Sequence, residues 1–149
     1  MIPLSKLPHP MNVLVADDDP VFCALAKNCL VKAGHEVQIV PDGAQALEAL
    51  ASSRHHAAIV DLSMPQIDGF RLIALIRATP ALEDLPIIVL SSRGDIASVE
   101  EAYRLGANTF LTKPVDWSLF TCHLNHVVRT SMAFSELRSE LYATRRKTA

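Results

Sequence analysis

The sequence predicts an α/β fold in which five parallel strands form a doubly wound sheet covered by five helices. Across 149 residues, strand and helix patterns alternate five times, as they do in a chain of βαβ units. The strand runs are short and apolar, as expected for strands that are buried on both faces. Strand order 2-1-3-4-5 is the most economical arrangement of such units.

The individual elements follow from apolar runs separated by capping and turn residues. The expected strands are residues 13–16, 36–40, 57–60, 87–90 and 109–112. The expected helices are residues 20–33, 44–52, 68–78, 95–105 and a last one that begins near residue 116. Asp19 and Asp68 suit helix N-caps, while Gly34 and Gly106 suit helix ends. Thr79-Pro80 breaks the third helix.

The last helix differs from the others because no strong breaker follows Asp116. Apolar residues recur every seven positions along it, and they are Phe120, Val127, Phe134 and Leu141. The positions between them are only partly apolar, so the pattern is half of a coiled-coil seam. We therefore expect an extended C-terminal helix. It either frays beyond the domain or projects as a dimer stalk or linker.

Composition and charge exclude several classes of protein. Half of the residues are hydrophobic and the formal net charge is −2, so no basic surface for nucleic acid or for a membrane is expected. No apolar run reaches the ~20 residues of a transmembrane helix. Residues 1–10 contain three prolines and one lysine but no apolar core of a signal peptide, so no signal peptide is expected there. We expect this segment to be disordered. Three cysteines without metal-site spacing indicate reduced thiols in a cytoplasmic protein.

Acidic side chains and one lysine follow three of the predicted strands. Asp17, Asp18 and Asp19 come after the first strand, Asp61 after the third and Lys113 after the fifth. Because parallel strands end at a shared edge where ligands bind, we expect these groups to converge on one small site. A carboxylate cluster beside a lysine is the arrangement that Mg²⁺ and a phosphoryl group require.

The chemistry expected of this cluster is phosphoryl transfer to Asp61. A carboxylate can attack a phosphoryl group and form an acyl phosphate, provided that charge is neutralised and the groups are in line. Asp18 and Asp61 would bind Mg²⁺ directly, Asp17 through water, and the Ser63 carbonyl would complete the set. Without metal, each close carboxylate pair would repel by ~4 kcal/mol at an effective dielectric constant of ~20.

Three further residues are expected to respond to the phosphoryl group. Lys113 would contact its oxygens, and Pro114 makes the preceding peptide bond a candidate for the cis form. Ser91, after the fourth strand, could donate a hydrogen bond to the same group. Phe110 could pack inward as Ser91 moves, which would carry the change to the surface of helix 4, strand 5 and helix 5.

In these segments the sequence resembles the response-regulator receiver domain of two-component signalling. The matching segments are VADDDP (15–20), DLSMPQIDG (61–69), LSS (90–92) and LTKP (111–114). The resemblance implies a flavodoxin-like fold, with the receiver at residues 11–130 and an extended helix or linker at 131–149. Phe110 stands where tyrosine is common in the family, so a contact that needs the tyrosine hydroxyl would be absent.

The resemblance also implies roles for the site residues. Asp61 would be phosphorylated by a phosphohistidine on a sensor kinase or a phosphotransfer protein. Asp17, Asp18 and the Ser63 carbonyl would serve Mg²⁺. Ser91 and Phe110 match the switch positions of the family. Such a domain catalyses only its own phosphorylation and dephosphorylation, and it could dimerise through the helix 4–strand 5–helix 5 surface or the C-terminal helix.

Two other functions are compatible with parts of the pattern. Residues 17–21 also fit the DxDx[TV] motif of haloacid-dehalogenase-type phosphatases, in which Asp17 would be the nucleophile and Asp19 the general acid. That hypothesis lacks the acidic pair that those enzymes need after Lys113, and it gives Asp61 no task. A receiver-like binding module that accepts no phosphate would normally have lost Asp61 or Lys113.

Overall fold

Residues 2–148 are described by a computed structural model, and Met1 and Ala149 fall outside it. The strands are β1 (Asn12–Ala16), β2 (Glu36–Val40), β3 (Ala57–Val60), β4 (Ile87–Ser91) and β5 (Thr109–Thr112). The helices are α1 (Pro20–Lys32), α2 (Gly43–Ser52), α3 (Gly69–Ala78), α4 (Ile96–Leu105) and α5 (Trp117–Thr148). Two short 3₁₀ helices, η1 (Leu4–Lys6) and η2 (Pro80–Leu82), were not expected from the sequence.

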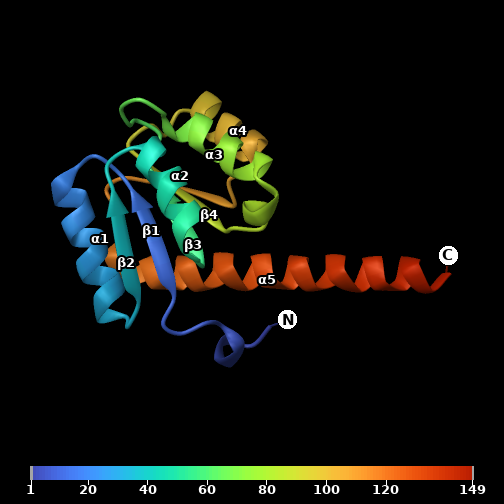
Figure 1. Cartoon of the computed structure of the whole chain (residues 1–149). Helices are drawn as coiled ribbons and strands as arrows, with labels where there is room; N and C mark the ends of the chain where they lie inside the picture. Colours follow the sequence, from blue (N-terminus) through green and yellow to red (C-terminus); the bar gives the residue numbers. More distant parts are fainter. Residues whose placement is uncertain (1, 149) are drawn as a thin grey trace.

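The five strands form one parallel sheet in the order β2-β1-β3-β4-β5, which confirms the predicted fold class. Helices α1 and α5 lie on one face of the sheet, while α2, α3 and α4 lie on the other (Figure 1). Strands β1 and β3 are neighbours although a whole βα unit separates them in the sequence. The sheet order therefore brings the residues that follow these two strands together.

Alternating residues of the strands build two hydrophobic cores, one on each face of the sheet. On β1, Val13 and Val15 face the core beneath α1 and α5, while Leu14 and Ala16 face the core beneath α2, α3 and α4. All four side chains are fully buried. This two-sided burial explains why the strands read as continuous apolar runs rather than as alternating ones.

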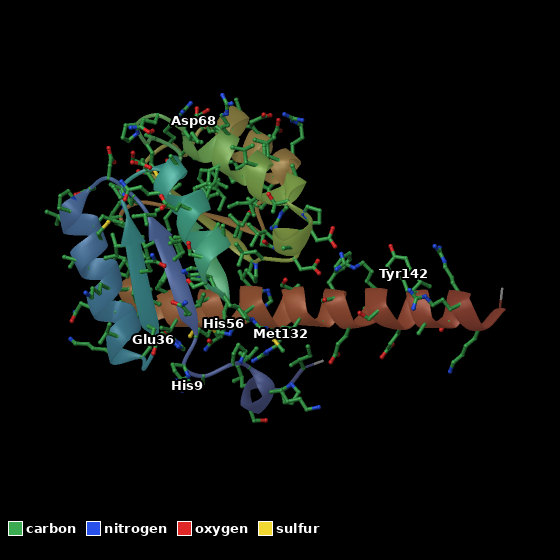
Figure 2. All side chains as sticks on the ribbon, in the orientation of Figure 1. His9, Glu36, His56, Asp68, Met132 and Tyr142 are labelled. Carbon is green, nitrogen blue, oxygen red and sulfur yellow. The ribbon has the colours of Figure 1, made fainter. Side chains whose placement is uncertain are left out.

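Helix α5 confirms the expected extended C-terminal helix and runs well past the sheet (Figure 1). Its first part is anchored by Phe120, which is fully buried. Farther along, the Ser131 hydroxyl donates to the Asp84 carbonyl at 2.9 Å, and Arg138 pairs with the Asp84 carboxylate. The helix projects past this tether, as Figure 2 shows at Tyr142. Apolar side chains are exposed on both sides of Arg138, namely Phe134 and Leu137 before it and Leu141 after it.

Residues 2–10 lie against the domain in the structure, and the disorder expected for residues 1–10 stays a prediction. Ile2 is buried, and Leu7 packs against the core beneath α1 and α5. The His9 ring also lies 3.2 Å from the Ala33 carbonyl, and the His9–Pro10 peptide bond is cis. These apolar contacts are the physical reason that the segment follows the domain surface.

No helix within residues 2–148 is long and apolar enough to cross a membrane.

Two glycines allow the chain to pass where a larger residue would not fit. A Cβ atom at Gly69 would lie 2.3 Å from the Asp61 carbonyl oxygen, so α3 can begin close beneath the end of β3 only with glycine there. Gly106 ends α4 with a φ of 116°, a left-handed conformation that glycine adopts without strain. Glycine at position 69 thus lets the start of α3 lie against the backbone of Asp61.

Two phenylalanines of α5 provide a matched test of this packing. Phe120→Ala should lower the free energy of unfolding by about 3–5 kcal/mol, because Phe120 is fully buried and the substitution leaves a cavity. Phe134→Ala should change it by less than about 0.5 kcal/mol, because Phe134 is 65% exposed. Urea denaturation followed by circular dichroism measures both values. Equal losses would contradict the assignment of residues 120 and 134 to core and surface.

Candidate functional site

The site lies where β1 and β3 end side by side. The register pairs Ala16 with Val60, so Asp17 and Asp61 are the next residues on the two strands. The Asp61 amide donates to the Ala16 carbonyl at 3.0 Å and continues the ladder by one bond. One carboxylate oxygen from each of Asp17, Asp18 and Asp61 lies within 4.8 Å of the others. The predicted convergence of these three acids is present in the structure.

Lys113 reaches the same cluster from the loop after β5. Its ammonium nitrogen lies 2.6 Å from Asp17 Oδ2 and 3.6 Å from Asp61 Oδ2. The Lys113 amide donates to the Ser91 carbonyl at 2.9 Å, which holds this loop against the end of β4. The Lys113–Pro114 peptide bond is cis, as the sequence suggested.

Burial and neighbouring charges shift the pKa values of Asp61 and Lys113. Burial, and then the neighbouring charge of Asp17, raise the pKa of Asp61 above its ordinary value, although Lys113 and the Ser63 amide oppose this. Burial alone would lower the pKa of Lys113, but its hydrogen bond to Asp17 and the charges of Asp61 and Asp17 outweigh that effect and raise it. The lysine therefore stays an ammonium group.

The donor set fits a small divalent cation. Three carboxylates face one ammonium group, which leaves two negative charges uncompensated when all of the groups are ionised. All of the candidate ligand atoms are oxygens, the type that Mg²⁺ prefers. Asp17 and Asp61 are buried, whereas Asp18 is exposed and leaves the cluster open to solvent on one side.

Three other residues predicted from the sequence to belong to the site are Ser63, Ser91 and Phe110. Ser63 is next to Asp61, and its amide donates to Asp61 Oδ1 at 3.3 Å. Ser91 is fully buried, and its hydroxyl oxygen accepts a bond from the Arg93 amide at 3.1 Å. Phe110 packs against the core on the side of α4 and is not part of the acidic cluster.

Asp19 belongs to the acidic triplet in the sequence but has a different task in the structure. It is the N-cap of α1, and its carboxylate accepts from the Val21 amide at 3.0 Å and from the Phe22 amide at 3.4 Å. Asp68 caps α3 in the same way by accepting from the Arg71 amide at 2.9 Å. Both expected helix caps are confirmed.

One neighbour of the site was missed in the sequence. The Lys113 ammonium nitrogen lies 4.0 Å from the centre of the Phe22 ring. Phe22 is in the first turn of α1, three residues after Asp19, while Lys113 comes 91 positions later in the chain. The available signal was that the topology places Phe22 and the loop that carries Lys113 at the same edge of the sheet. The sequence pattern alone did not indicate a contact with the lysine.

Comparison with known proteins agrees with the fold and identifies a family. The family model of the response regulator receiver domain matches residues 13–125. Response regulator MprA of Mycolicibacterium vanbaalenii is 34% identical over 105 residues, which are 70% of this chain and 45% of MprA. The chain thus corresponds to somewhat less than half of that relative's length.

Solved structures give the same result. A sensor protein from Polaromonas sp. JS666 superposes with a TM-score of 0.76 and 33% identity, covering 83% of this chain and 99% of its own. The receiver domain of the sensor histidine kinase PA1611 from Pseudomonas aeruginosa superposes with a TM-score of 0.74 and 27% identity. The match covers 79% of this chain and 97% of that receiver domain. That receiver domain carries a magnesium ion coordinated in its active-site cleft.

These comparisons favour the receiver over the phosphatase hypothesis that begins from Asp17. The matched region contains all of the residues that the receiver hypothesis uses, and the structure gathers the acids and Lys113 at one edge of the sheet. Receiver domains are phosphoacceptor signalling domains, and as a family they are generally not enzymes. The chain belongs to the response regulator receiver domain family of bacterial two-component systems.

Proposed function

We propose that this chain is a phosphoacceptor switch in which Asp61 takes a phosphoryl group from a phosphohistidine donor. The observation that carries the proposal is the position of the buried Asp61 carboxylate, next to Asp17 and Asp18 and 3.6 Å from the Lys113 ammonium. A nucleophile, acidic ligands and a cation thus meet at one point. Beyond this transfer and the later loss of its own phosphoryl group, the chain would catalyse nothing.

In the proposed reaction, an Asp61 carboxylate oxygen attacks phosphorus in line with the bond to the histidine nitrogen. The new O–P bond forms as the N–P bond breaks, and the electron pair of that bond returns to the imidazole. The Lys113 ammonium, 3.6 Å from Asp61 Oδ2, donates to a phosphoryl oxygen. The Ser91 hydroxyl is the second donor proposed for that group.

The residues proposed to hold Mg²⁺ are Asp18, Asp61 and the Ser63 carbonyl, with Asp17 acting through water. When bound, the ion would neutralise charge on the phosphoryl oxygens. The support is the oxygen-only donor set, its uncompensated negative charge and the magnesium ion in the related PA1611 receiver. Lys113 alone cannot balance three carboxylates, and this is the reason a divalent ion is proposed.

The proposed output surface comprises α4, β5 and α5. Ser91 ends β4 and pairs with Thr112 of β5, so a movement of its hydroxyl toward the phosphoryl group would pull on the strand that carries Phe110. Receiver domains exchange phosphoryl groups with histidine kinases or phosphotransfer proteins, and we propose such a cytoplasmic partner here. We propose no direct contact with nucleic acid or with a membrane.

We further propose that residues 11–130 are the receiver unit and that residues 131–149, of which Ala149 lies outside the described residues, are a linker or a dimer stalk formed by the end of α5. The family match at residues 13–125 and the projection of α5 support this division. A homodimer could form through the α4–β5–α5 surface or through the projecting part of α5. The latter exposes Phe134, Leu137 and Leu141.

Phosphorylation of one residue is the first expected outcome. Incubation with acetyl phosphate and Mg²⁺ should add one phosphoryl group to the wild type and none to Asp61→Asn, because the variant lacks the nucleophile. Lys113→Ala should slow the reaction by roughly 10- to 100-fold, since it removes a charge-assisted contact with the transferred group. Intact-protein mass spectrometry gives both results. An adduct on Asp61→Asn would contradict the proposal.

Removal of the acidic repulsion is expected to stabilise the metal-free protein. The pKa of Asp61 is raised in the folded state, so stability falls as pH rises from the ordinary aspartate pKa through the raised value, and at pH 7 the ionised carboxylate is destabilising. Asp61→Asn should therefore raise the melting temperature in EDTA at pH 7. Added Mg²⁺ should raise it in the wild type and have less effect in the variant. Calorimetry at pH 4 and 7 checks the sign.

The proposed output surface predicts where activation is felt. Addition of beryllofluoride and Mg²⁺ should shift the backbone NMR signals of β5 and of the facing sides of α4 and α5. Ser91→Ala should weaken those distant shifts while leaving binding at Asp61 in place. Sedimentation of the same samples reports dimer formation. Shifts confined to the loops around Asp17 and Asp61 would rule out the proposed coupling.

A further inference from the structure

An aromatic cluster lies directly behind the lysine of the site. The Phe22 ring is 4.0 Å from the Lys113 ammonium nitrogen, measured to its centre. On its other side, Phe22 contacts Trp117 with a centroid distance of 5.5 Å, and Trp117 contacts Phe120 at the same distance. Phe22 is 7% exposed and Phe120 is fully buried. The cluster thus continues from the hydrophobic core to the charged site.

We propose that Phe22 is a positioning residue for phosphoryl transfer, and that its ring face holds the Lys113 ammonium toward Asp17 and Asp61. The proposal rests on the proposed function, because it assigns Phe22 a role in the reaction at Asp61. Phe22 touches neither the phosphoryl group nor the metal in this account. It acts only through Lys113.

The geometry explains why such a support is useful. A lysine has a flexible four-carbon side chain and three N–H donors, so its head group is not fixed by one partner. Asp17 takes one donor at 2.6 Å, and Asp61 lies at 3.6 Å. The negative face of the Phe22 ring attracts the same ammonium from another direction, with the Lys113 side chain only 19% exposed. Three contacts then define one position for the nitrogen.

The ring itself is held in place from two sides. Asp19 caps α1 and accepts from the Phe22 amide, which fixes the first turn of the helix. Trp117, the first residue of α5, packs against the ring, and Trp117 is in turn packed against Phe120. The third aspartate of the acidic triplet thus supports the lysine indirectly, although it is not one of the clustered metal-ligand candidates.

A purely structural role for Phe22 makes a different prediction. If the ring only filled space beneath α1, an aliphatic side chain of similar size would serve as well, and the electron density of the ring face would not matter. Leucine is such a side chain. Tyrosine keeps the face, and trifluorophenylalanine keeps the shape while weakening the attraction of the face for a cation. These three replacements separate packing from cation binding.

The test compares the rate of Asp61 phosphorylation by acetyl phosphate in wild type, Phe22→Leu, Phe22→Tyr and the protein with trifluorophenylalanine at position 22. We expect Phe22→Leu to be roughly three- to tenfold slower, the fluorinated protein to be intermediate and Phe22→Tyr to be within about twofold of wild type. Mg²⁺ affinity should be the same in all four. The Lys113 methylene NMR signals should lose their ring-current shift only in Phe22→Leu.

Each result decides the matter. Equal rates for wild type and the fluorinated protein would overturn the inference even if Phe22→Leu were too unstable to measure. A wild-type rate in Phe22→Leu, or an absent ring-current shift in the wild type, would overturn it as well. Failure of the wild type to be phosphorylated on Asp61 would instead defeat the proposed function. The ring-current shift needs no phosphoryl group, so it still tests the contact in that case.

Discussion

The site depends on the mutual repulsion of three carboxylates. The register of β1 and β3 keeps two of them, Asp17 and Asp61, close to each other. Asp17 and Asp61 follow paired residues of neighbouring parallel strands, so they cannot separate without disturbing the sheet. Their charges would push them apart in the absence of a cation. The Lys113 ammonium offsets part of this charge at 2.6 Å from Asp17. The remainder is the basis of our proposal that the site binds a divalent ion and, with it, a phosphoryl group.

The rest of the fold serves to keep these groups in place. Gly69 lets α3 begin against the backbone of Asp61, where any Cβ atom would collide with the Asp61 carbonyl. The bond between the Lys113 amide and the Ser91 carbonyl ties the loop after β5 to the end of β4. Both constraints involve backbone atoms, so they place the backbone of Asp61 and of Lys113 independently of the side-chain contacts within the site.

Much of this arrangement could be read from the sequence because it depends on local signals and on topology. Asp19 and Asp68 are helix caps because short acidic side chains accept from the free amides of a first helical turn. The meeting of Asp17, Asp61 and Lys113 follows once strand order is known. The contact of Phe22 with Lys113 depends on side-chain directions, and the tether of Arg138 to Asp84 depends on the angle of α5. Periodicity carries neither kind of information.

The most direct test of the central claim is a crystal structure of the protein grown with Mg²⁺ and beryllofluoride. The account predicts beryllium on an Asp61 carboxylate oxygen, the Lys113 ammonium bonded to fluorine, and a magnesium ion bound by Asp18, Asp61 and the Ser63 carbonyl. Beryllofluoride on Asp17, or an ion that leaves Asp61 free, would contradict it.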